Sequence, residues 1–259
     1  MRRLDHLVAQ DDLSGAWCNA NAVTSSVMEA ISFTTPVLEN FFIHTVAECM
    51  PGKQDAELRQ RCRSFMHEES THTRAHKKFN ASLLDYLLRA PPGAALLQAI
   101  MAGARKHVTL SRRLLYVVAL EHFAAVLSKR YLTLHRDWKI GSAYARELFE
   151  QHAREEMGHR SVVFDLWVQQ ESIGRVARTL AVLSILFAGG VYISVAVPWI
   201  VHRKNDKRVG GTLAALAAYV LKSHQIAEGA TLLRELFSFT RRDFHPDGPT
   251  AAQFAGDLK

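Results

Sequence analysis

The chain has 259 residues, of which 48% are hydrophobic and 22% are charged, and 32 Lys and Arg against 25 Asp and Glu give a formal charge of +7. These values exclude a disordered tail, a collagen-like fibre and a small disulfide scaffold, and the length suits one large domain or a compact pair. The three cysteines have no zinc or redox spacing, which indicates a reducing compartment. Polar residues follow the basic start, so we expect no secretory leader and a cytoplasmic location.

Proline and glycine residues divide the chain into long segments of helical periodicity, with almost no alternating strand pattern. Thr35 and Pro36 predict a helix start, and this helix runs to about residue 50. Further helices are predicted at about 54–89, 94–106, 108–135, 142–171, 179–201 and 212–240. The pattern predicts an all-α antiparallel bundle. We expect one continuous domain, with the bundle over 1–175, C-terminal helices over 176–242 and an irregular tail over 243–259.

Two of these helices carry a Glu-x-x-His motif, Glu69 with His72 and Glu156 with His159. Residues three apart lie on one face of a helix, so a carboxylate and an imidazole converge on one point. One such motif is common on a solvated helix surface and says little alone. Two of them on facing helices could supply four metal ligands.

Two further helices each offer a carboxylate in an apolar setting. Glu121 is the only acidic residue between His107 and Asp137, and Glu39 lies in a similarly apolar segment. A lone buried carboxylate costs several kcal/mol unless it is protonated, paired or bound to a metal. Four helices thus predict metal ligands in the order Glu39, Glu69 and His72, Glu121, Glu156 and His159.

Other polar residues near these motifs are candidates for further ligands or for groups that support the ligands. Glu48 is an alternative to Glu39, but it lies on the opposite face of its helix. His152 is four residues before Glu156 and is expected to be a seventh ligand, while His76 is either an eighth ligand or a donor behind the ligands. Asp165 either orients a ligand histidine or is a helix-surface acid. Glu68 and Glu155 point away from the faces of the two motifs, and we expect them to be solvated acids or acids that support the ligands.

The ligand order resembles that of ferritin-like di-iron carboxylate proteins. The segments around Glu69, Glu121 and Glu156 more closely resemble a bacterial family described as predicted metal-dependent hydrolases, over about residues 15–205. His152 completes a pattern similar to that of the di-iron enzyme para-aminobenzoate N-oxygenase. The resemblance implies a ferritin-like four-helix bundle with additional C-terminal helices, two Fe ions with Mn or Zn as alternatives, and O₂ as co-substrate. Within this site we expect Glu121 and His152 to act in catalysis.

The leading hypothesis is a non-haem di-iron oxygenase or oxidase that oxidises an apolar, lipid-like or amine-bearing small molecule with electrons from an external donor. A binuclear metal-dependent hydrolase is the alternative. The near-match to a zinc-protease motif fails, because His67 and His72 are five residues apart and cannot share one ion on a regular helix. A metal-storage protein is the second alternative.

Residues 179–201 contain no charged residue and are long enough to cross a bilayer. Three readings are open: a helix buried in the core or in a homo-oligomer, a helix inserted in one leaflet together with 213–221, or a true span. The basic residues that follow suit anionic headgroups, so residues 179–208 are a candidate for peripheral membrane contact; they are Arg203, Lys204, Lys207 and Arg208. No nucleic-acid partner is expected, because the other basic residues are dispersed.

Overall fold

The computed structural model describes residues 13, 15–50, 55–134, 138–170, 174–205 and 223–248. Seven helices account for most of these residues, and the described part of the chain contains no strand beyond one isolated bridge between Cys18 and Ile140. The predicted all-α class is confirmed. The division into 1–175 and 176–242 stays a prediction.

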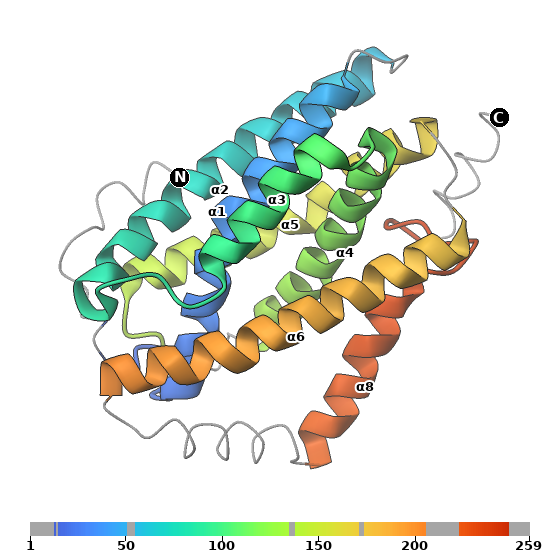
Figure 1. Cartoon of the computed structure of the whole chain (residues 1–259). Helices are drawn as coiled ribbons and strands as arrows, with labels where there is room; N and C mark the ends of the chain where they lie inside the picture. Colours follow the sequence, from blue (N-terminus) through green and yellow to red (C-terminus); the bar gives the residue numbers. More distant parts are fainter. Residues whose placement is uncertain are drawn as a thin grey trace.

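Four helices form the bundle, namely α1 (Ala22–Cys49), α2 (Ala56–Leu87), α4 (Leu110–Leu134) and α5 (Ala143–Gln170). The closest pairs are α1 with α2 and α4 with α5, and contacts of α2 with α5 and of α1 with α4 close the ring. The helix α3 (Ala94–His107) connects α2 to α4 along the outside of α1 (Figure 1). This arrangement is the predicted ferritin-like bundle.

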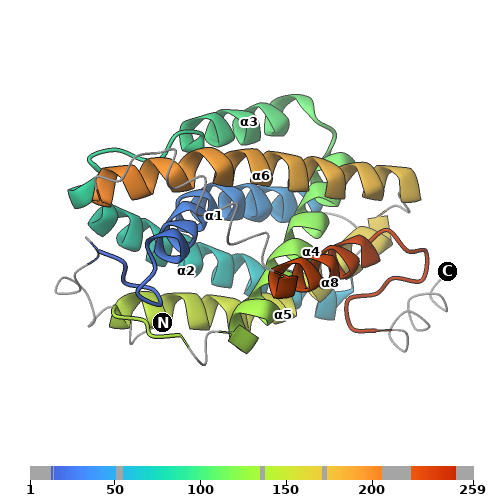
Figure 2. The same cartoon turned by 90° about the horizontal axis from the view of Figure 1, so that it is seen from below.

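Two helices cover the bundle from outside. The helix α6 (Arg175–Asn205) crosses α1, α4 and α2, and α8 (Ser223–Ser238) packs against α4 and α6. Figure 2 shows α3 and α6 at one edge of the molecule and α5 at the opposite edge. Residues 206–222 lie outside the described part of the chain. They include Lys207, Arg208 and the beginning of the helix predicted at 212–240. Residues 249–259 of the predicted tail also lie outside it.

The predicted start of the first helix at Pro36 is wrong. Helix α1 begins at Ala22, because the Asn21 side chain accepts hydrogen bonds from the backbone N–H groups of Val23 and Thr24. Pro36 instead lies inside the helix, where it removes the N–H that would bond the carbonyl of Ser32. The Asn80 side chain of α2 donates to that carbonyl at 2.9 Å, so a neighbouring helix compensates for the proline.

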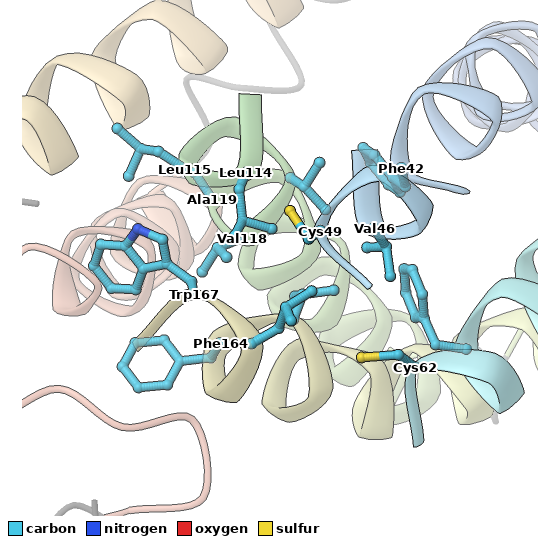
Figure 3. Close-up of a cluster of buried hydrophobic side chains, with 14 of the residues drawn as sticks. Phe42, Val46, Cys49, Cys62, Leu114, Leu115, Val118, Ala119, Phe164 and Trp167 are labelled. Atoms are coloured by element: carbon cyan, nitrogen blue, oxygen red, sulfur yellow. The ribbon is translucent and has the colours of Figure 1, made fainter. Parts of the chain in front are cut away.

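Two apolar clusters occupy the two ends of the bundle. One contains Phe79 and Leu83 of α2 with Leu148 and Phe149 of α5. The other contains residues of all four bundle helices, among them those labelled in Figure 3, such as Phe42, Cys62, Val118 and Trp167. On α2 and α5 the predicted ligands lie between the two clusters in the sequence. Apolar packing therefore separates the ligands from water at both ends.

Candidate metal centre

Seven predicted ligands from four helices converge inside the bundle. Glu39 comes from α1, Glu121 from α4, and the other five from α2 and α5, namely Glu69, His72, His152, Glu156 and His159. Their exposure is 0–3%, apart from His152, whose side chain is 18% exposed. Helical spacing explains the convergence, because each Glu-x-x-His pair presents both side chains on the face that points into the bundle.

Glu69 and Glu156 each face both metal-binding histidines. The Nδ1 atom of His159 is 2.7 Å from Glu69 Oε1 and 3.4 Å from Glu156 Oε1. The Nδ1 atom of His72 is 3.6 and 3.9 Å from the same two oxygens. These four residues can offer ligand atoms within 4.8 Å of one another. Glu69 and Glu156 would therefore each be within reach of any ion held by either histidine.

The remaining ligands extend this group on two sides. Glu39 Oε1 lies 3.8 Å from Nδ1 of both His72 and His152, and these three residues form a second group that could hold an ion. Glu121 is electrostatically coupled to Glu156, Glu69 and His159. One ion could be held by Glu39, His72 and His152, and another by the group of Glu69, His72, Glu156 and His159.

Buried polar atoms in this cluster have no hydrogen-bond partner among the described residues. They are Glu39 Oε1, both oxygens of Glu69, His72 Nδ1, both oxygens of Glu121 and His159 Nδ1. Buried polar groups are normally hydrogen-bonded, so a concentration of this kind requires an explanation. Two divalent cations would supply it, since their four positive charges equal the four negative charges of Glu39, Glu69, Glu121 and Glu156. The donor set of carboxylates and imidazoles fits such ions.

The titration behaviour reflects the burial of several like charges. Burial and the neighbouring carboxylates raise the pKa of Glu39 and Glu121 well above the usual value. Burial opposes protonation of His72, but the hydrogen bond to Glu155 and the nearby negative charges of Glu69 and Glu39 outweigh it and raise the pKa to about 10. The pKa of His159 is also raised, because the favourable interaction of its protonated ring with Glu156, Glu68 and Glu69 exceeds the effect of burial. Without metal, the cluster therefore holds protons at neutral pH.

Metal binding should release these protons, and this gives a pH-dependence prediction. All four raised pKa values mean that bound protons compete with the metal, so apparent affinity should increase with pH between about 6 and 8. At pH 7, we expect metal addition to release about two or more protons per chain. Titration calorimetry in two buffers of different ionisation enthalpy measures this number. Glu39→Gln should release fewer protons, and a pH-independent affinity would contradict the assignment.

Two further carboxylates hold the metal-binding histidines from outside, in a crossed pattern. Glu68 of α2 accepts from Nε2 of His159 on α5 at 2.8 Å, and Glu155 of α5 accepts from Nε2 of His72 on α2 at 2.5 Å. Each bond leaves Nδ1 of the ring facing the cluster, which is the arrangement that carboxylate–histidine pairs give to a metal ligand. Sequence reasoning left these two residues between solvated and supporting acids. The repeated Glu-Glu-x-x-His at 68–72 and 155–159 is the signal that could have found them.

A second hydrogen-bonded chain reaches His152 through His76. Asn80 donates its amide N–H to the Ser32 carbonyl, so its Oδ1 must accept the Ser32 hydroxyl hydrogen, at 2.7 Å. The Ser32 oxygen then accepts from Nδ1 of His76 at 2.8 Å. Burial and the neighbouring His72 lower the pKa of His76 to about 3, so this ring is neutral and its Nε2 is an acceptor.

This acceptor faces His152. The distance from His76 Nε2 to His152 Nδ1 is 3.3 Å, so Nδ1 of His152 carries the hydrogen and Nε2 keeps the lone pair. Nε2 of His152 lies 3.4 Å from Glu156 Oε1, on the side of the cluster. Of the two roles considered for His76, these contacts favour the supporting donor–acceptor over an eighth ligand.

Removing His76 should therefore weaken metal binding without removing a ligand. We expect His76→Ala to lower metal affinity about 10- to 100-fold, because His152 loses the partner that orients its ring. The measurement is competition with a chelator of known affinity. His122→Ala is the matched control: His122 is also buried, but its Nε2 donates to the backbone carbonyl of Glu235. If both variants lost the same affinity, general loosening of the core would explain the effect instead.

The other candidates lie outside the cluster. Asp165 accepts a hydrogen bond from Arg61 at 2.7 Å and lies 3.4 Å from His245. These contacts favour a helix-surface acid over a residue that orients His72 or His159. Glu48 forms an ion pair with Arg113. Its place as the alternative first ligand is excluded by this pairing.

A pocket of about 240 Å³ adjoins the centre between α2 and α5. Its lining includes Arg61 and Glu68 from α2 and Glu155 and His159 from α5. The pocket thus reaches the outer side of one metal-binding histidine. Its wall carries two carboxylates and a guanidinium together with the apolar side chains of Phe65 and Val162.

Comparison with known proteins agrees with this geometry. A family model described as "Predicted metal-dependent hydrolase" matches residues 1–249. The chain belongs to this family. No curated protein and no solved structure matches the chain. For this member of the predicted metal-dependent hydrolase family, the buried Glu and His cluster is the group of residues that could hold the metal. The match extends beyond residues 15–205, where the resemblance was expected, and also includes α8.

Proposed function

We propose that this protein is a non-haem di-iron enzyme that uses O₂ to oxidise a small molecule. The observation that carries the proposal is the position of Glu69 and Glu156, each facing both His72 and His159 in a site that is 0–3% exposed. Two ions that share carboxylate bridges can act together on one small molecule. The chain's resemblance to ferritin-like di-iron proteins supports the same reading.

The donor set favours iron among the divalent metals. Four carboxylates with three imidazoles combine the oxygen ligands preferred by Mg²⁺ and Mn²⁺ with the nitrogen ligands preferred by Zn²⁺ and Fe²⁺. Two bound Fe²⁺ ions would supply two of the four electrons that O₂ takes up on reduction to the level of water, the substrate supplies the other two, and an external donor restores the ferrous state. Manganese and zinc are the alternatives for the same ligands.

The surrounding residues support such chemistry in three ways. The two apolar clusters exclude water from both ends of the site. Glu68 and Glu155 hold the two metal-binding rings in position. These two carboxylates also line the pocket, so they favour an amine-bearing substrate over the lipid-like one that the apolar helices suggested.

The test is metal analysis of protein from its native host, followed by anaerobic reduction and exposure to O₂. We expect about two iron ions per chain and rapid O₂ uptake that requires reduction. Glu69→Ala should abolish this uptake, whereas Glu48→Ala, which removes an acid outside the cluster, should not. Zinc alone without O₂ uptake, or less than one metal per chain, would overturn the proposal.

A binuclear hydrolase is the second candidate, and the family's description favours it. Two bridged ions can activate a water molecule as a nucleophile, and the pocket beside His159 would admit that water. This enzyme would cleave ester, amide or phosphoester substrates anaerobically with Zn²⁺ or Mn²⁺. A storage protein, the third candidate, would take up iron and turn over no organic substrate.

A further inference from the structure

The helix α6 exposes a long apolar stripe. Among the described helices it alone is long and apolar enough to cross a membrane, yet only 22% of its most apolar stretch is buried. Its large exposed apolar residues recur every three or four positions and so follow one side of the helix: they are Val176, Leu180, Leu183, Phe187, Val191 and Val195, at 47–75% exposure. This side spans about 28 Å at 1.5 Å per residue.

The opposite side of α6 packs against the protein towards both ends of the helix. Ala181 and Val182 belong to one buried apolar cluster, and Val197 and Ile200 belong to the other. The helix therefore lies lengthwise on the bundle, as Figure 1 shows, and cannot leave it to cross a bilayer without exposing both clusters. Of the three readings of residues 179–201, this packing argues against an independent span, and the exposed stripe argues against full burial in the core of one chain; burial in a homo-oligomer and insertion in one leaflet stay open.

Helix α3 extends the same kind of surface. It lies at the same edge of the molecule as α6 in Figure 2, and the two helices come close at the start of α3, where a Cβ on Gly93 would lie 3.0 Å from the Tyr192 ring. Leu96 and Ile100 of α3 are 65% and 51% exposed. Large exposed apolar surfaces mark interaction sites.

The charges on this surface have one sign. Neither α3 nor α6 contains an acidic residue, and α3 ends with Arg105, Lys106 and His107. Arg175 begins α6, and near its other end the guanidinium groups of Arg89 and Arg203 lie over the Trp199 ring at 5.7 and 5.6 Å. Lys204, which the sequence places in the basic cluster, is instead buried against Glu29.

We propose that the α3–α6 face, defined by these two helices, docks on an anionic membrane surface. The apolar stripe would enter the boundary between headgroups and acyl chains, with the basic residues at both ends of α6 against anionic headgroups. A tryptophan between arginines suits this boundary. This contact is independent of the proposed oxidation chemistry, and the pocket, lined by α2 and α5, is left accessible.

Charge argues against a second copy of the chain as the occupant. Both ends of α6 are basic and the helix carries no carboxylate. Parallel or antiparallel contact between two such helices would therefore place like charges opposite each other at both ends, which is unfavourable. Anionic lipid removes this conflict.

The test is co-sedimentation of the full-length, metal-loaded protein with vesicles. We expect binding to vesicles of phosphatidylcholine with 30% phosphatidylglycerol, weaker binding to pure phosphatidylcholine, and partial release by salt. Phe187→Asp should reduce partitioning about tenfold or more, because a charge replaces the most exposed ring of the stripe. Arg203→Glu should have a similar effect, while Arg154→Glu is the matched control, since Arg154 is an exposed arginine on α5.

Circular dichroism and metal content should be unchanged in these variants, because every substituted side chain is exposed. Three results would overturn the proposal: no binding to either vesicle, equal loss for Arg154→Glu and Arg203→Glu, or a concentration-dependent dimer that Phe187→Asp dissociates. The last result would assign the face to a second copy. If the metal-loaded protein binds vesicles but takes up no O₂ after reduction, the oxygenase proposal is refuted and the membrane proposal is not.

Discussion

Replacing Glu121 with leucine is expected to remove at least one metal ion per chain and to stabilise the metal-free protein. The carboxylate is fully buried, and neither oxygen has a hydrogen-bond partner among the described residues. Without metal its burial is unfavourable, so an apolar side chain of similar size should raise the free energy of unfolding by about 1–3 kcal/mol. With metal, the variant should lose the stabilisation that the missing ion provides. Opposite effects on the two forms identify a ligand.

Metal content and urea unfolding, each measured with and without metal, check this prediction. Glu48→Leu is the control, because Glu48 is also a glutamate of a bundle helix but forms an ion pair with Arg113. It should leave the metal content unchanged and bring no stabilisation of the metal-free form. Retention of both ions by the Glu121 variant would remove this residue from the centre.

The ligands could be predicted from sequence because each depends on local helix geometry. Glu69 and His72 share a face through their spacing alone, and Glu121 was distinguished by its apolar neighbours. The structure brings all seven predicted ligands together. Their role as metal ligands and the identity of the metal stay predictions.

The partners of the supporting residues could not be predicted, because they depend on how helices face one another. The repeated Glu-Glu-x-x-His marks Glu68 and Glu155 but not the histidine that each of them contacts. Glu68 reaches His159 only because α2 and α5 pack at one particular register, which no single helix determines. The contribution of Pro36 is a similar case. In sequence alone, a proline after a threonine indicates the start of a helix. Here Pro36 lies inside α1, and Asn80 of α2 donates to the Ser32 carbonyl, which lacks a backbone donor because proline has no N–H.

The uncharged helix was ambiguous for a different reason. Residues 179–201 are apolar on every side, so periodicity could not identify the side that is buried. Tertiary packing decides it: Val197 and Ile200 enter the core while Phe187 stays exposed. In the same way, sequence grouped Lys204 with the exposed basic residues, although its side chain is 1% exposed.

The buried pair of Lys204 and Glu29 leads to a stability prediction. Lys204 Nζ and the Trp17 indole N–H both donate to Glu29 Oε1 at 2.6 Å, which ties the end of α6 to α1. Lys204→Met would leave a buried carboxylate without its cation, and we expect it to lower the free energy of unfolding by about 3–5 kcal/mol. Lys129→Met, which removes a lysine exposed beside Glu235, should cost no more than about 1 kcal/mol.

The loss of stability in Lys204→Met should depend on pH, and the direction of this dependence identifies the cause. Burial already raises the pKa of Glu29, and removal of Lys204 takes away the charge that opposes this rise. Since the folded-state pKa lies above the unfolded value, folding is favoured at low pH and stability is lost as pH increases through the folded pKa. Urea unfolding at pH 5 and pH 8 should show the larger defect at pH 8. Lys204→Met with Glu29→Gln should recover most of the loss, because the amide oxygen still accepts from Trp17; without recovery, lost packing of the lysine stem would be the cause.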